Sequence, residues 1–161
     1  MTTTASREAK ITIDDKMPSI TIVREFDAPA KAVYRAHTDP VLFVQWVGPD
    51  SLESSRVDRW DCRTGGEWRY VSVRGKEEHW FRGCFHEVRP DEVIVQTFTY
   101  EPVPDSVSLG RLVLEDLPGG RCRLTVTSLV DSFEARDAFI ASGMEVGVQE
   151  GYRKLDALLA R

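Results

Sequence analysis

Five ionisable side chains near the middle of the chain could supply a buried acid or base. They are Glu67, Arg69, Glu78, His79 and Glu87. No spacing among them selects an acid–base pair, and side chains on the solvent face of a sheet give the same pattern. We therefore leave the catalytic residues unassigned. Arg69 and His79 are retained as candidate polar groups of a buried site, because ligand pockets combine apolar walls with a few placed polar groups.

The histidines and cysteines do not follow a metal-binding pattern. His79 and His86 are seven residues apart in one expected strand, so their side chains point to opposite faces. Cys62, Cys84 and Cys122 are odd in number and have no CxxC spacing, which argues against a disulfide framework and a zinc ribbon. GxSxG, GxGxxG, P-loop and HExxH motifs are absent from the sequence. We expect reduced thiols, no metal and no cofactor.

Aromatic side chains could instead line an apolar binding site. Trp68 and Tyr70 share one face of an expected strand, and Phe81 and Phe85 share one face of the next. The residues that we expect to contact a ligand are Trp46, Trp68, Tyr70, Phe81, Phe98, Met144, Gly147 and Gly151. Packing of these aromatic rings into a closed core is the alternative, and the sequence leaves both open.

Three glycines recur at every fourth residue within an apolar-periodic segment near the end of the chain. Gly143, Gly147 and Gly151 lie in an amphipathic helix that we expect after Asp131, about 25 residues long. Each glycine in a helix interior costs about 1 kcal/mol relative to alanine. Gly151 lies in the middle of the apolar face, so another group must approach the helix there. That group is either a large side chain from the sheet or a bound ligand.

The remaining elements are predicted from strand and turn signals. Residues 20–27 alternate as a strand, and two short helices follow, the second beginning at Asp39 and Pro40. Six more strands are expected at residues 53–60, 67–73, 79–88, 93–100, 107–114 and 123–129. Short links between consecutive strands favour an antiparallel meander. Residues 1–18 are expected to form a flexible arm, in which residues 11–13 could add an edge strand, and residues 19–161 a single domain.

Composition narrows the classes of partner. The 161 residues carry 21 basic and 26 acidic side chains, a net charge of −5, without a basic stripe for nucleic acid. No apolar run approaches the roughly 18 residues of a membrane span. The first ten residues are polar and lack the apolar centre of a signal peptide. We expect a cytoplasmic protein that binds neither nucleic acid nor membrane.

Several short stretches, in this order, resemble a known family. They are REFDAP at 24–29, DP at 39–40, WVGP at 46–49, DCRTGGEW at 61–68, FRGCFHEVRP at 81–90 and SGMEVG at 142–147. The chain resembles the START-like and Bet v 1-like helix-grip proteins, and more specifically the bacterial branch related to the C-terminal domain of the activator of Hsp90 ATPase. The resemblance implies an α+β fold. A curved antiparallel sheet of six to seven strands would surround a long C-terminal helix, with two short helices after the first strand.

The resemblance implies a function only in outline, because this fold carries many activities. We expect the chain to bind a small hydrophobic or aromatic molecule in an apolar cavity between the sheet and the C-terminal helix. Two alternatives stay open. One is an aromatase-, cyclase- or hydrolase-type enzyme acting on a polyketide-like substrate. The other is a protein-interaction or chaperone-associated role, including a homodimer. The eukaryotic Hsp90 activator engages Hsp90 through a separate N-terminal domain, and we expect no such domain within these 161 residues.

Overall fold

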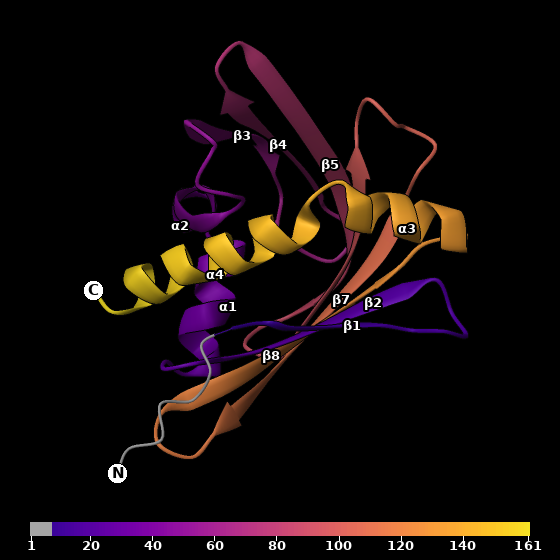
Figure 1. Ribbon diagram of the computed structural model, residues 1–161. Helices are drawn as coiled ribbons and strands as arrows, with labels where there is room; N and C mark the ends of the chain where they lie inside the picture. Colours follow the sequence, from indigo (N-terminus) through magenta and orange to yellow (C-terminus); the bar gives the residue numbers. More distant parts are fainter. Residues whose placement is uncertain (1–7) are drawn as a thin grey trace.

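One antiparallel sheet of eight strands forms the body of the molecule, in the order β1-β2-β8-β7-β6-β5-β4-β3 (Figure 1). The computed structural model describes residues 8–161. The strands are β1 (Lys10–Ile13), β2 (Ser19–Phe26), β3 (Ser54–Trp60), β4 (Glu67–Arg74), β5 (Glu77–Arg89), β6 (Val93–Tyr100), β7 (Ser108–Leu117) and β8 (Arg121–Leu129). Strands β3 to β8 make the expected meander, and β2 pairs with β8. The predicted α+β helix-grip fold is therefore confirmed.

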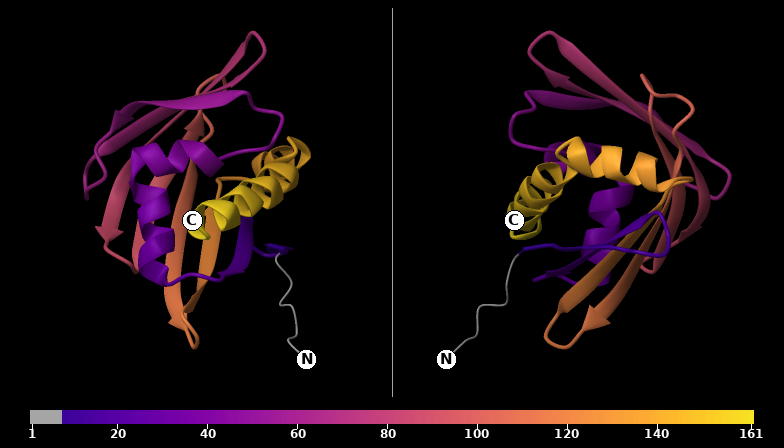
Figure 2. Two further views of the ribbon diagram at one scale, coloured as in Figure 1. Left: turned by 90° about the vertical axis from the view of Figure 1, so that its left-hand side faces the viewer. Right: turned by 45° about the vertical axis from the view of Figure 1, so that its right-hand side comes forward.

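Four helices accompany the sheet: α1 (Ala30–Thr38), α2 (Pro40–Trp46), α3 (Phe133–Ala141) and α4 (Met144–Leu159). Asp39 separates the first two, because its side chain accepts a hydrogen bond from the Val41 N–H and Pro40 begins the new helix. Helix α4 crosses the open side of the bent sheet, with α1 and α2 beside its C-terminal half (Figures 1 and 2). Within residues 8–161, no helix is long and apolar enough to span a membrane.

Strand β1 lies within residues 1–18, at the place where residues 11–13 could add an edge strand. Its four residues pair with β2, from Lys10 opposite Val23 to Ile13 opposite Ile20. The side chain of Gln149 on α4 also bonds both the N–H and the carbonyl of Ala9, each at 2.9 Å. The strand forms because it satisfies the free edge of β2. The sheet thus has eight strands rather than six or seven, and residues 1–7 of the predicted arm lie outside the described residues.

The expected long C-terminal helix is divided in two at Gly143. This glycine has φ of +89°, in the left-handed region that side-chain-bearing residues rarely adopt. The N–H of Ser142 bonds back to the carbonyl of Ala138, which ends α3, and α4 begins at Met144. Helices α3 and α4 therefore run in different directions and form two walls over the sheet (Figure 2).

A closed core lies under α1 and the C-terminal half of α4. Its largest fully buried side chains are Phe26, Val33, Cys122, Leu124 and Leu155. One charged pair is buried beside this core. The guanidinium of Arg24, only 2% exposed, forms two bonds to the carboxylate of Asp156, Nη1–Oδ1 at 3.0 Å and Nη2–Oδ2 at 2.5 Å. This ion pair connects β2 to α4.

Candidate functional site

A cavity of about 980 Å³ lies between the sheet and the two C-terminal helices. Strands β4, β5 and β6 form its floor, α3 and the first turns of α4 form one wall, and the segment between α2 and β3 forms another. The side chains that define the floor are Tyr70, Ser72, Arg74, His79, Phe81, Phe98 and Tyr100. The cavity adjoins the closed core, because Tyr70 belongs to both and Phe81 and Phe98 pack against core side chains.

Stacked aromatic rings form the centre of the floor. The ring of Phe81 lies 5.1 Å from that of Tyr70, with an angle of 27° between the planes. It also lies 5.3 Å from the ring of Phe98. Burial raises the pKa of Tyr70 far above its ordinary value, so this phenol stays protonated. The floor therefore offers flat, uncharged surfaces on which an aromatic or other apolar molecule can pack.

The helical wall leaves apolar side chains facing open space. None of the nine residues of α3 is buried. Phe139 on α3 is 36% exposed and Val146 on α4 is 55% exposed, and both line the cavity. Met144 lines it too. Gly147 lies where α4 meets Pro49, and a Cβ added to Gly147 would lie 3.5 Å from the proline Cδ.

A few polar groups interrupt this apolar lining. His79 Nδ1 lies 2.8 Å from the hydroxyl oxygen of Tyr100. Ser72 Oγ bonds to Ser55 Oγ at 2.9 Å. At the rim, Arg74 Nη2 donates to the hydroxyl of Ser51 at 2.7 Å. An apolar volume with isolated polar groups is the usual composition of a small-molecule site.

Two residues expected in the cavity lie in the closed core instead. Trp46 is buried, and its Nε1–H donates to the carbonyl of Ala36 at 2.9 Å. Gly151 lies directly under the end of α2, where a Cβ would come within 3.2 Å of the Trp46 carbonyl oxygen. The space at Gly151 is thus filled by the backbone of α2 and not by a ligand. This corrects the expected placement of both residues.

Trp68 is buried beside the cavity floor, on the same face of β4 as Tyr70, and it does not line the cavity. Its indole ring covers Gly83 on the neighbouring strand, and a Cβ on Gly83 would lie 2.6 Å from the ring. The same Cβ would lie 2.0 Å from the carbonyl oxygen of Thr97. The missing side chain at Gly83 therefore makes room for the indole, and Trp68 supports Tyr70, whose ring lies 5.7 Å away.

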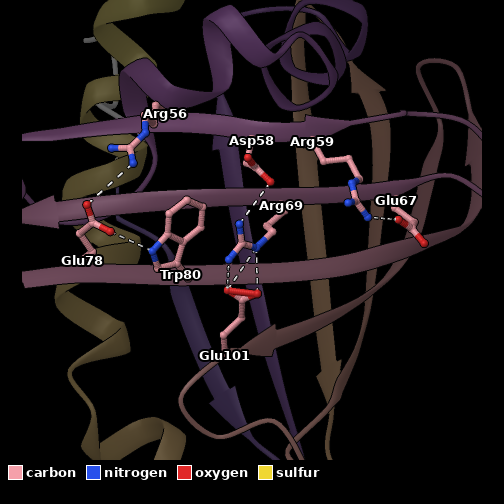
Figure 3. A network of polar contacts seen from close by, with 8 residues as sticks. All are labelled: Arg56, Asp58, Arg59, Glu67, Arg69, Glu78, Trp80 and Glu101. Carbon is pink, nitrogen blue, oxygen red and sulfur yellow. Dashed lines mark hydrogen bonds and ion pairs between the residues drawn. The ribbon is translucent and has the colours of Figure 1, made fainter.

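Arg69 lies on the opposite face of the sheet, away from the cavity (Figure 3). Its guanidinium bonds to Glu101 through Nε and Nη2, each at 2.9 Å, and to Asp58 at 3.2 Å. It also lies over the ring of Trp80, 3.8 Å from the centroid. The other pairs in Figure 3 are Arg59 with Glu67, Arg56 with Glu78, and Glu78 with Trp80. Strand alternation makes this placement, because Arg69 lies between Trp68 and Tyr70.

The cysteines do not bring a nucleophile to the cavity. Burial raises the pKa of Cys62 and of Cys122 to about 11, so both are protonated thiols at neutral pH. Cys84 is exposed on β5, and none of the three lines the cavity. Within residues 8–161, no group of three or more histidine, cysteine, aspartate or glutamate side chains is placed to hold a metal ion.

The candidates selected from sequence did not include Tyr100 or the residues of α3. Tyr100 shares a strand face with Phe98, so alternation carries a signal for it. Helix α3 carries no comparable signal, because its position over the cavity depends on the chain reversal at Gly143. Of the predicted residues, the structure brings Tyr70, His79, Phe81, Phe98, Met144 and Gly147 together around one cavity.

Comparison with known proteins places this geometry in a family. The family model for activator of Hsp90 ATPase homolog 1-like proteins matches residues 27–160. A solution structure of a protein from Arthrobacter aurescens has a TM-score of 0.84 at 25% identity and covers 94% of this chain and 91% of its own. Protein Ms6760 from Mycobacterium smegmatis has a TM-score of 0.82 at 24% identity and covers 94% and 96%.

A more distant similarity connects the fold to a protein of stated role. PFC0360w, an HSP90 activator from Plasmodium falciparum, has a TM-score of 0.54 at 19% identity and covers 69% of this chain and 71% of its own. That likeness concerns the fold alone. No curated protein matches the chain in sequence. Because the family model covers residues 27–160, this chain belongs to the activator of Hsp90 ATPase homolog 1-like family.

Proposed function

We infer that the chain binds a small hydrophobic or aromatic molecule in the cavity between the sheet and helices α3 and α4. The observation that carries this proposal is the cavity itself, at about 980 Å³ and floored by stacked aromatic rings. This volume lies at the upper end of the range of small-molecule pockets, about 300 to 1,000 Å³. A core that existed only for stability would be packed closed.

The exposed side chains at the rim also support the proposal. Val103, Phe139 and Val146 are large apolar residues that are more than one third exposed, and all three line the cavity. Each gains stability when its surface is removed from water, at about 25 cal/mol per Å² of apolar area. A ligand that contacts them provides this burial. The unburied helix α3 would then gain a packing partner.

Thermal unfolding with a panel of fatty acids, sterols, flavonoids and polyketide-like aromatics tests the proposal. A ligand at about 100 times its Kd adds roughly 2.7 kcal/mol of stability, which raises Tm by several degrees for a domain of this size. We expect a clear shift with one chemical class. The Ala138→Trp variant should show a smaller shift, because Ala138 is exposed on α3 and lines the cavity, so an indole there takes up part of the space open to a ligand.

Ala141→Trp is the matched control. Ala141 is exposed on the same helix and does not line the cavity, so this variant should keep the shift. The proposal fails if no class of compound raises Tm. It also fails if Ala138→Trp responds to the active class as strongly as the wild type does. The first result would favour a role in binding protein partners, and the second would place the ligand outside this cavity.

A further inference from the structure

Tyr100, His79 and Glu77 contact one another in series, and Tyr100 and His79 line the cavity. The hydroxyl oxygen of Tyr100 lies 2.8 Å from Nδ1 of His79, and both residues line the cavity. The second ring nitrogen, Nε2, is buried and lies 3.4 Å from Oε2 of Glu77. The alignment of this last contact is poorer than that of a hydrogen bond, so the carboxylate acts on the ring through its charge.

The carboxylate of Glu77, although 69% exposed, favours one of the two tautomers of a neutral His79 ring. A neutral imidazole has one N–H donor and one acceptor nitrogen. The negative charge of Glu77 favours the proton on Nε2, which leaves Nδ1 of His79 as the acceptor. The O–H of Tyr100 must then point at Nδ1. The proton of the phenol is engaged, and its oxygen retains lone pairs that can accept.

The acceptor on Tyr100 lies beside the aromatic floor. The ring of Tyr100 lies 5.2 Å from that of Phe81, which stacks on Tyr70. Among the hydrogen bonds of the described residues, the Tyr100 hydroxyl forms only the one with His79. An aromatic molecule lying on Phe81 therefore brings its edge toward the Tyr100 oxygen. This oxygen can accept a hydrogen bond from the ligand, while its own proton is donated to His79.

We propose that Tyr100, oriented by His79 and Glu77, selects aromatic ligands that carry a hydroxyl group. This inference rests on the proposed function and specifies its ligand class. A phenolic O–H donates to the Tyr100 oxygen, whereas an ether or a carbonyl offers only lone pairs to it. The net gain from one neutral hydrogen bond corresponds to roughly twofold to tenfold in affinity.

Three probes of one shape test the assignment: 2-naphthol, 2-methoxynaphthalene and naphthalene. Their Kd values are measured by equilibrium dialysis against the wild type and the Tyr100→Phe variant. We expect the wild type to bind 2-naphthol roughly twofold to tenfold more tightly than 2-methoxynaphthalene. Tyr100→Phe should lose this preference and keep its affinity for naphthalene, because the ring remains. Tyr34→Phe is the matched control, since Tyr34 lies outside the cavity, and it should behave as the wild type.

A His79→Leu variant tests the orientation separately. Without the acceptor nitrogen, the Tyr100 O–H is free to rotate and to donate to an ether oxygen. The preference for 2-naphthol over 2-methoxynaphthalene should therefore narrow, although Tyr100 is still present. The ratio of the two Kd values in this variant therefore shows whether His79 orients the Tyr100 hydroxyl, or whether the hydroxyl acts only as a polar group.

Equal affinity of the wild type for 2-naphthol and 2-methoxynaphthalene overturns the inference, and so does an unchanged preference in Tyr100→Phe. If naphthalene still binds in either case, the proposed cavity function stands and only the selectivity fails. Binding of none of the three probes also overturns the inference. In that case the Tm shifts with fatty acids and sterols test the proposed cavity function separately.

Discussion

His37 on α1 is a histidine whose surroundings lower its pKa well below the ordinary value. Its ring lies 4.7 Å from that of Trp46, and its Nδ1–H donates to the carbonyl of Val33 at 2.7 Å. Burial lowers the pKa of His37 from 6.5 to about 4, because the charged imidazolium loses its hydration there. The residue is therefore neutral at physiological pH and serves to pack α1 against α2.

Acidification should weaken the fold through this residue. Between pH 6.5 and pH 4, the unfolded chain binds a proton at His37 that the native state rejects, so stability falls as the pH falls. From pH 7 to pH 5 we expect this group to cost on the order of 1 to 2 kcal/mol. Urea unfolding of the wild type and of His37→Gln at pH 7 and pH 5 measures this loss of stability. The variant should lose less stability on acidification, and an identical loss in the two proteins would contradict the assignment.

At the same scale, strand alternation located the faces of the site residues but not their depth. It placed Trp68 and Tyr70 on one face, and the same alternation puts Arg69 on the other face, which corrects the expectation that Arg69 contributes to the cavity. It could not show that Trp68 is covered while Tyr70 faces the cavity. That difference depends on Gly83, whose missing side chain admits the indole. This contact is between two strands, so the sequence of either strand alone does not predict it.

At the scale of elements, apolar periodicity predicted the C-terminal helical segment but not the break that divides it into α3 and α4. The apolar period continues through Gly143, so a single helix was expected, although the φ of this residue is +89°. Each of the three glycines has its own role. Gly143 turns the chain, Gly147 lines the cavity, and Gly151 lets α4 approach the end of α2. The meander was predictable because turn residues separate its strands, whereas the four residues of β1 gain their structure by pairing with β2.

These separate roles predict opposite effects of the same substitution. Gly147→Ala should raise the free energy of unfolding by about 0.5 to 1 kcal/mol, because a helix interior favours alanine and the new Cβ meets Pro49 at an ordinary 3.5 Å. Gly143→Ala should lower it by about 1 kcal/mol or more, because alanine is strained at positive φ. Urea denaturation of both variants measures this. Stabilisation by Gly143→Ala would show that one continuous helix is accessible.

At the scale of the whole molecule, the fold is closed by contacts between its two ends. Strand β2 pairs with β8, and α4 returns over β2, so the first and last elements share one core. The Arg24–Asp156 ion pair joins residues 132 positions apart. Strand alternation puts Arg24 on the buried face with Ile22 and Phe26, but nothing in the local sequence marks Asp156 as its partner, since Asp156 lies on the polar face of an amphipathic helix. Only the packing of α4 on β2 brings them together.

Removing one partner of this ion pair should lower the free energy of unfolding much more than replacing both partners. Asp156→Ala leaves the guanidinium of Arg24, 2% exposed, without its carboxylate, and we expect the free energy of unfolding to fall by about 3 kcal/mol. The double variant Arg24→Met with Asp156→Leu should recover most of this loss, because two apolar side chains replace the buried charges. Glu115→Ala breaks the exposed pair with Arg123 and should cost under about 1 kcal/mol. Urea unfolding of the three variants measures these free energies. A double variant as unstable as Asp156→Ala would contradict the prediction, because the loss of stability would then come from packing at this site and not from the unpaired charge.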